Sequence, residues 1–413
     1  MSGKMRIGLA GICGYGRHYL DRLLDEAQEN DAELVVAIAR RPKRSERYEE
    51  LRDRGIRICG SPEEFYENDT VDAMILSSPI HLHKPYSCLA LEKGSDVFCE
   101  KPVAGAIQDA RVMVEAEAAT GRRIGIGYQW SWSDTIQALK KDILAGDFGR
   151  PLRFRALIFW GRNENYFKRN TWVGRFREDD GSWVLDSPLN NATAHFVHNM
   201  FYLLGSEPER SASPADVQAE LYRANPIQNF DTAAMRSHTA DGVELLFYTT
   251  HATAVDEGPI LCYEFENATV YYELHAGDNF IARLKDGSRR EYGNPYHREW
   301  DKIWKAVTCI RDGGRMTCGV EACMSQTICA NGAQESMPDI VEFPEKLKSV
   351  ETVDGARFTT VEGLESVLIQ CFHQGILPSE HGGFGWAREG KVIDLRGYES
   401  FPATVSEESF PRQ

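Results

Sequence analysis

Long apolar runs are missing from this sequence. No window of about 18 residues is continuously apolar, and a membrane-spanning helix needs roughly that length. The first residues, MSGKMRIGLAG, enter a strand pattern almost at once, which leaves no room for a secretory signal. We therefore expect a cytoplasmic protein without a membrane partner.

Closely spaced cysteine pairs and an excess of basic residues are missing as well. The ten cysteines include no C-x-x-C pair, and Cys318, Cys323 and Cys329 are too irregularly spaced for a zinc knuckle. We expect reduced thiols and no metal site. The formal net charge of −15 argues against a nucleic-acid partner, because a duplex binder needs a basic face.

The first third of the chain alternates between strand and helix patterns. Short apolar segments at 5–10, 34–39, 71–77, 95–99 and 123–127 are separated by helical patterns such as 17–30 and 107–119. Such alternation predicts an α/β Rossmann domain, a doubly wound parallel sheet, over residues 1–128. A chain of 413 residues has room for at least one more domain.

A glycine loop joins the first predicted strand to the first predicted helix. Strand, glycine loop and helix form the context of a dinucleotide fingerprint, in which the glycines let the backbone approach a pyrophosphate. Cys13 occupies the middle position of the usual G-x-G-x-x-G pattern, and a plain tight turn is the alternative interpretation. The predicted cofactor residues here are Gly11, Cys13, Gly14, Tyr15 and Gly16.

The end of the second predicted strand carries Arg40 and Arg41. An NAD-binding fold usually places an acidic residue there to bind the ribose hydroxyls. A guanidinium fork suits a 2′-phosphate instead, so the cofactor is expected to be NADP or NAD, with NADP favoured. The alternative is a basic, solvated helix start.

Glu100, Lys101 and Pro102 follow the predicted strand at 95–99 directly. Ligands of open α/β sheets bind beyond the carboxyl ends of the strands. Pro102 also biases Lys101 towards an extended backbone, which would hold its side chain in a defined direction. Taken alone, the tripeptide is more typical of a strand end with two solvated charges, and the functional interpretation gains weight from the residues that precede it.

Four motifs together resemble one family. The glycine loop, Ser78-Pro79 with His83, Glu100-Lys101-Pro102 and Gly127-Tyr128-Gln129 come in the order and spacing of the Gfo/Idh/MocA family, over residues 4 to about 205. The resemblance implies an NAD(P)-dependent oxidoreductase acting on a sugar, cyclitol or related polyol. Other members of that family cleave glycosides with the help of NAD or act as non-catalytic sensors, and both remain alternatives.

The resemblance also implies roles for single residues. Lys101 would lie near the nicotinamide and the reacting substrate oxygen. The cofactor would further contact Ser78, Pro79, His83, Glu100, Lys101 and Gln129. For His83, capping of the helix that begins there is an equal alternative.

The second part of the chain changes pattern. Strand-like segments follow one another at 217–223, 232–238, 244–251, 261–265 and 269–275, with hairpin signals at Asp241-Gly242 and Asp286-Gly287. They predict an α+β domain with an open, mainly antiparallel sheet over residues 129–403, with helices at 134–145, 298–311, 320–335 and 361–374. One sheet face would need cover, so we expect a homodimer or homotetramer. Residues 404–413 are expected to form a mobile tail.

A second chemical segment precedes these strands. The family pattern D-x-G-x-H-x-x-D falls on Asn191, Thr193, His195 and His198, so that the histidine is kept and both carboxylates are absent. If the segment is helical, Asn191 and His195 share one helix face. We expect His198 to be a surface or interface residue, and we reject a His195–His198 metal pair because it lacks further spaced ligands.

The resulting hypothesis assigns catalysis to Lys101 and His195. Lys101 would polarise the substrate oxygen while His195 exchanges the proton. The predicted substrate contacts are Lys101, Tyr128, Trp172, Asn191 and His195. Tryptophans at such spacing are also typical of a core, and Arg162, Lys168 and Arg175 leave an acidic substrate open.

Overall fold

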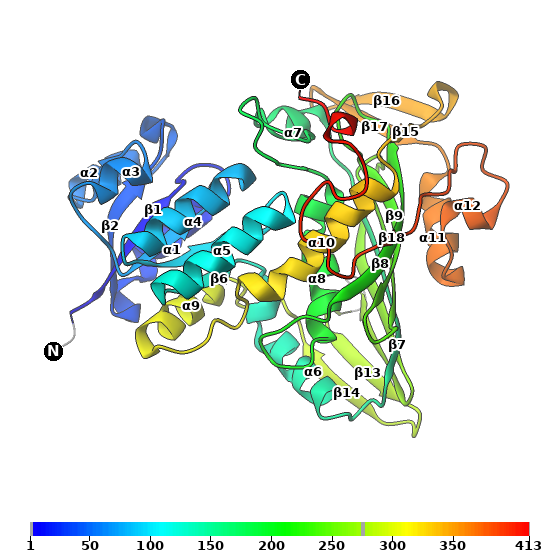
Figure 1. Ribbon diagram of the computed structural model, residues 1–413, viewed down its shortest axis with the longest axis horizontal. Coiled ribbons are helices and arrows are strands. Elements are labelled where there is room, and N and C mark those ends of the chain that lie inside the picture. The colour runs from blue at the N-terminus through cyan, green and yellow to red at the C-terminus, as the bar shows by residue number, and fades with distance from the viewer. Residues whose placement is uncertain (1–2, 274–276, 413) are drawn as a thin grey trace.

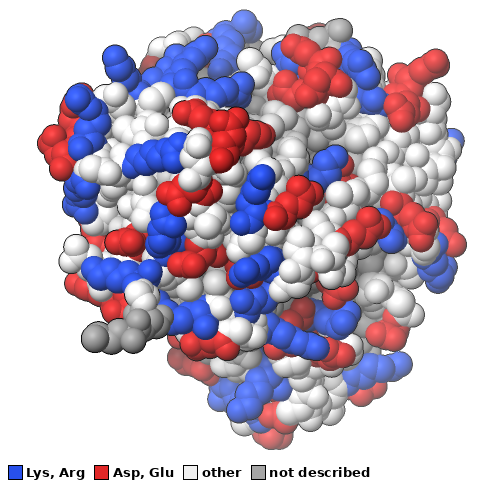
Figure 2. Space-filling view, turned by 60° about the vertical axis from the view of Figure 1, so that its left-hand side comes forward, with Lys and Arg blue, Asp and Glu red and all other residues white. Residues whose placement is uncertain are grey.

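Two β-sheets organise the molecule, and a computed structural model describes residues 3–273 and 277–412. Figure 1 places the smaller sheet near the N-terminus and the larger one across the molecule from it. No helix in the described ranges is long and apolar enough to cross a membrane. On the face that Figure 2 draws, basic and acidic side chains are interspersed.

The first sheet has six parallel strands in the order β3-β2-β1-β4-β5-β6. This is the Rossmann order, which reverses direction next to β1 and β4. The predicted doubly wound domain is therefore confirmed. Its strands are β1 (Met5–Ala10), β2 (Ala32–Ile38), β3 (Arg57–Cys59), β4 (Ala73–Leu76), β5 (Asp96–Cys99) and β6 (Ile124–Ile126). Its helices are α1 (Gly16–Glu26), α2 (Tyr48–Asp53), α3 (Pro62–Tyr66), α4 (His83–Glu92) and α5 (Ile107–Thr120).

The second sheet has ten strands in the order β14-β13-β12-β11-β7-β10-β9-β8-β15, with β18 paired to β8. Neighbours are antiparallel except β7 with β10 and β8 with β15, so the mainly antiparallel sheet is confirmed. The strands are β7 (Pro151–Trp160), β8 (Pro214–Arg223), β9 (Thr232–Thr239), β10 (Glu244–Thr250), β11 (Asp256–Phe265), β12 (Ala268–Glu273), β13 (Phe280–Leu284), β14 (Arg289–Gly293), β15 (Val341–Glu342) and β18 (Ile393–Asp394). The end of the strand expected at 269–275 lies outside the described residues.

Helices and a small hairpin surround this sheet. α8 and α10 lie on the side that faces the first domain, whereas α11 and α12 lie on the opposite side (Figure 1). α10 also contacts α5 and β6, so that the chain returns to the first domain. The elements are α6 (Asp134–Leu144), α7 (Glu164–Lys168), α8 (Ala194–Leu203), α9 (Asp301–Asp312), α10 (Val320–Ser336), β16 (Lys348–Val353), β17 (Ala356–Val361), α11 (Leu364–Gln374) and α12 (Pro378–His381).

The far face of the second sheet is covered by the chain itself. Leu246 and Tyr248 of β10 pack in one buried cluster with Leu368 and Phe372 of α11. The homo-oligomer stays a prediction, but the argument from an uncovered apolar face does not apply where α11 lies.

The C-terminal segment, expected to form a mobile tail, contacts the rest of the chain at Thr404 and Phe410. Phe410 is buried against Trp183 and Phe401. The Glu335 carboxylate accepts a 2.6 Å hydrogen bond from the backbone N–H of Thr404. Apolar burial and a buried acceptor therefore fix a segment whose composition alone is typical of a tail.

Phe410→Ala should lower the free energy of unfolding by about 3 kcal/mol, the lower end for truncating a buried phenylalanine. Urea unfolding followed by circular dichroism measures this. Glu408→Ala, an exposed change in the same segment, serves as the control. Equal midpoints for the two variants would contradict the packing described here.

Candidate functional site

The glycine loop between β1 and α1 can only be built from glycine at two positions. Gly11 has φ +93°, and a Cβ there would lie 2.0 Å from the carbonyl oxygen of Ser77. A Cβ on Gly16 would lie 2.1 Å from the carbonyl oxygen of Gly11. Around Gly14 there is open space, and the first turn of α1 has no side-chain cap and no acidic residue. A loop of this shape fits an anionic group at a helix N-terminus.

A surface pocket lies beside this loop, and one of the three arginines that follow β2 lines it. Arg44 lines it, whereas Arg40 and Arg41 do not. Within the described ranges none of these three arginines forms an ion pair, so their guanidinium groups are open to a ligand. The full lining is Ile12, Cys13, Gly14, Arg17, His18, Arg44, Ser45 and Glu46.

Two predicted cofactor residues present buried polar atoms without a partner. The Ser78 hydroxyl and the Oε1 atom of Gln129 are both buried and form no hydrogen bond with the described residues. Ser78 and Pro79 follow β4, and Gln129 begins the turn after β6, at the carboxyl edge of the sheet. Because buried polar groups are normally hydrogen-bonded, these orphaned atoms fit a ligand such as a nicotinamide.

His83 is held by the protein on both sides of its ring. Nδ1 lies 2.8 Å from the carbonyl oxygen of Pro102, and Nε2 lies 3.0 Å from that of Ser78. Burial lowers its pKa. His83 thus joins two loops of the site, and its side chain does not cap α4 as the alternative interpretation expected.

Glu100 lies in a buried ion pair. Its carboxylate is 2.8 Å from the Nζ atom of Lys302 on α9, and it accepts a hydrogen bond from the Tyr19 hydroxyl. Burial raises the pKa of Glu100, but the ammonium groups of Lys302 and Lys101 outweigh it and hold that pKa below its usual value. Glu100 is thus ionised, and its charge lies next to that of Lys101.

Lys101 points across to the second domain. Its Nζ atom donates to the backbone oxygen of Asn191 at 2.9 Å and to Oδ1 of Asn191 at 3.1 Å. The amide nitrogen of Asn191 donates in turn to Asp186 at 2.6 Å. Burial lowers the pKa of Lys101 to about 8, and the nearby Lys302 ammonium adds to this shift. An amine that titrates near neutrality can both hold and exchange a proton.

Asn191 does not share a helix with His195, contrary to the sequence-based expectation. Asn191 lies in a short π-helical turn, Pro188–Ala192, and His195 lies in the first turn of α8. Thr193, with φ −106° and ψ 8°, separates them. Asn191 therefore serves Lys101 and Asp186 instead of the imidazole.

His195 presents an unpartnered ring nitrogen. Its Nδ1 atom is buried and forms no hydrogen bond with the described residues. Burial, together with the positive charges of Lys101 and Lys302, lowers the pKa of His195 well below its usual value. The imidazole is therefore neutral at pH 7.

The ring of Tyr128 contacts the rings of both His195 and His198. Its hydroxyl donates to Gln326 at 2.9 Å, and its ring meets the His195 ring edge-on at 5.6 Å. The hydroxyl is buried and engaged, so the predicted substrate contact of Tyr128 is not supported.

His198 is a core residue, and its prediction as a surface or interface residue is wrong. It is buried, it stacks on Tyr128 with ring centroids 4.1 Å apart, and its Nε2 atom lies 2.9 Å from the Ser131 hydroxyl. α8 is covered by α10 and the turn after β6, and this burial places even its polar side chains inside.

Trp172 is half-buried. Its indole N–H is buried without a partner, and the Arg169 guanidinium is 5.7 Å from its ring centroid. Arg169 also opposes the rise that burial causes in the pKa of Asp186. By contrast, Lys168 and Arg175 are engaged in ion pairs with Glu164 and Asp179.

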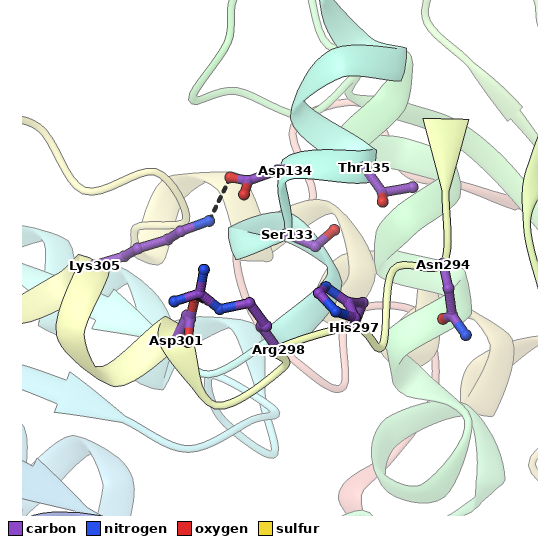
Figure 3. A pocket seen from close by; sticks show the side chains of 8 residues that line it. All are labelled: Ser133, Asp134, Thr135, Asn294, His297, Arg298, Asp301 and Lys305. Atoms are coloured by element: carbon purple, nitrogen blue, oxygen red, sulfur yellow. Dashed lines mark hydrogen bonds and ion pairs between the residues drawn. The ribbon is translucent and has the colours of Figure 1, made fainter. Parts of the chain in front are cut away.

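A second, polar pocket lies between the start of α6 and the segment that leads into α9 (Figure 3). Lys305 and Asp134 face each other there at 2.6 Å. None of the predicted site residues lines it. Its residues are Ser133, Asp134, Thr135, Asn294, His297, Arg298, Asp301 and Lys305.

A protein-family model matches the first domain. The model of the Gfo/Idh/MocA oxidoreductase family, with an NAD-binding Rossmann fold, matches residues 5–128. The matched residues comprise the Rossmann domain. The motif resemblance seen in the sequence is thereby confirmed for the Rossmann domain.

Curated relatives extend the similarity in part. Inositol 2-dehydrogenase of Klebsiella pneumoniae is 31% identical over 222 residues, which cover 53% of this chain and 56% of that protein. Inositol 2-dehydrogenase 4 of Saccharopolyspora erythraea is 31% identical over 150 residues, which cover 36% and 44%. This chain thus spans about half the length of these relatives.

Solved structures share the fold over most of the chain. The WlbA dehydrogenase of Bordetella pertussis, in complex with NADH and UDP-GlcNAcA, superposes with a TM-score of 0.64 at 21% identity. The match covers 80% of this chain and 97% of that one. At this identity the likeness establishes the two-domain fold.

Sequence reasoning missed Lys302 and Arg169. Lys302 lies 202 residues from Glu100 along the chain, on a helix without a motif, so that no local signal reveals the pair. Its ammonium also lies 4.9 Å from the ring centroid of Trp300 and 5.6 Å from that of Tyr15. Lys302 therefore contacts both Glu100, the neighbour of Lys101, and Tyr15 of the glycine loop.

Lys302→Met should lower the free energy of unfolding by about 3–5 kcal/mol, because it leaves the buried Glu100 carboxylate without its partner. Denaturant unfolding measures the effect. Lys305→Met is the matched control on the same helix, since its ion pair with the exposed Asp134 contributes less than about 1 kcal/mol. A loss of the same size in both variants would contradict the importance of the Glu100 pair.

Proposed function

We propose that this protein is an NAD(P)-dependent oxidoreductase that acts on a secondary alcohol of a sugar, cyclitol or related polyol, or on the matching ketone. The observation that carries the proposal is Lys101, an amine with a pKa of about 8 at the carboxyl edge of β5. Unpartnered atoms of Ser78 and Gln129 lie at the same edge of the sheet. The inositol dehydrogenases among the relatives support the substrate class.

The bound nicotinamide would supply the redox chemistry, taking up or giving back a hydride. The task left to the protein is to hold the hydroxyl and move its proton. The Lys101 amine contacts two oxygens of Asn191, and a substrate oxygen that replaces one of them would accept a hydrogen bond from the amine. In the oxidation direction the neutral amine accepts the hydroxyl proton, and in reduction the ammonium returns it.

His195 takes a different part from the one expected from the sequence. Its lowered pKa makes the imidazole a weak base, so we assign proton exchange to Lys101 and a substrate hydrogen bond to Nδ1 of His195. Asn191 and Asp186 keep the Lys101 amine in place through a chain of hydrogen bonds. This arrangement replaces the carboxylates that the family pattern carries at 191 and 198.

Activity on a panel of sugars, cyclitols and keto-sugars, read by nicotinamide absorbance, tests the proposed function. Lys101→Ala should lose about 10²–10⁴-fold in kcat, the usual contribution of a positioned acid or base, while calorimetry still detects cofactor binding. Lys141→Ala, an exposed change on α6, is the control. Product release without a lasting absorbance change would favour the NAD-assisted glycosidase instead.

The rate of alcohol oxidation should rise with pH through about 8, because the neutral amine of Lys101 is the proton acceptor. The rate of ketone reduction should fall over the same range. Lys101→Arg should remove this inflection, since a guanidinium does not titrate there. An unchanged inflection in Lys101→Arg would assign the titration to another group.

NADP should bind more tightly than NAD, because Arg40, Arg41 and Arg44 are free to contact a 2′-phosphate. Arg40→Asp should reverse the preference, as measured by calorimetry with both cofactors. Arg52→Asp, the same charge change at an exposed ion pair with Glu49, is the control. Equal binding of both cofactors that Arg40→Asp leaves unchanged would overturn this.

A further inference from the structure

Two thiols and an imidazole meet in the core behind Tyr128. His198 comes from α8, Cys318 from the segment before α10, and Cys323 from the first turn of α10. All three side chains are buried. The Sγ atom of Cys318 lies 3.5 Å from the Sγ atom of Cys323 and 3.5 Å from the Nε2 atom of His198.

We propose that His198, Cys318 and Cys323 bind a structural zinc ion, with the Ser131 hydroxyl in the fourth position. The three ligand atoms lie within 4.8 Å of one another. The Ser131 Oγ atom is 2.9 Å from Nε2 of His198 and therefore lies next to these three atoms. Neither the family match nor the proposed oxidoreductase activity requires such a site.

Two of the three separations between the ligand atoms match those of a zinc site. Tetrahedral zinc, with bonds of about 2.3 Å to sulfur and about 2.0 Å to nitrogen, separates two sulfurs by about 3.8 Å and a sulfur from a nitrogen by about 3.6 Å. Both observed separations are 3.5 Å. A disulfide would need the two sulfurs at about 2.05 Å.

The chemistry of the ligands and the burial of the cluster agree with this assignment. Thiolate and imidazole are the ligand types that zinc prefers. Two thiolates balance the charge of Zn²⁺, so the site is neutral, as a buried site should be. Because solvent does not reach the three side chains, the ion would be structural.

The position of the cluster indicates what the ion would hold together. The backbone oxygen of Cys318 accepts a 2.7 Å hydrogen bond from Ile126 at the end of β6. Tyr128 stacks on His198 and meets His195 edge-on. Zinc would therefore join α8 and α10 to the Rossmann sheet next to Tyr128, which contacts His195.

This proposal departs from the sequence-based expectation of no metal site. That expectation judged the cysteines by their mutual spacing and His198 by its distance from His195 along the chain. The third ligand, His198, lies 120 residues from Cys318 along the chain, and only folding brings the two side chains together.

Mass spectrometry of the metal content of the purified full-length protein, after dialysis against a weak chelator, tests the site. We expect a single zinc ion per chain. Cys318→Ser and Cys323→Ser should lose it, whereas Cys329→Ser should keep it, because Cys329 lies on α10 with its sulfur towards Met235.

Cobalt exchange tests the ligands without relying on the variants to fold. Co²⁺ introduced into the wild-type protein should give thiolate-to-metal charge-transfer bands and the visible absorption of a tetrahedral site. Metal-free protein with ten free thiols, a Cys318–Cys323 disulfide in the peptide map, a cobalt spectrum without thiolate bands, or zinc retained in both Cys318→Ser and Cys323→Ser would each overturn the proposal.

Discussion

The site depends on the buried ion pair between Glu100 and Lys302. Glu100 directly follows β5 of the Rossmann sheet, and Lys302 lies on α9 of the second domain. Because Lys302 neutralises Glu100, the neighbouring Lys101 amine is free to turn towards Asn191 instead of pairing with Glu100. One interaction thus joins the two domains and leaves Lys101 directed at Asn191, while burial lowers the pKa of Lys101 against the opposing effect of the Glu100 carboxylate.

The second domain completes the site through segments that have little regular structure. Asp186 follows Leu185, which has φ +47°, a conformation that costs energy for a branched side chain. The short turn at 188–192 then aims two oxygens of Asn191 at Lys101. Strained or irregular backbone of this kind is typical of places where geometry serves chemistry.

Local signals explain what the sequence predicts well. The glycine loop, the strand alternation and the position of Lys101 depend on neighbours within a few residues, and the structure places them as expected. The contacts of Lys302, the burial of His198 and the packing of Phe410 depend on segments far away along the chain. Composition and spacing carry no signal for such contacts, so these features were missed or wrongly assigned.

The large sheet is open, and both of its ends are protected. At one end lies β14, whose Arg289, Arg290 and Glu291 put charges on the edge. At the other end lies β15, which has only two residues and is followed by Pro344. Charged and very short edge strands are poor templates for strand addition. The two ends of this ten-stranded open sheet therefore disfavour pairing with a strand of another molecule.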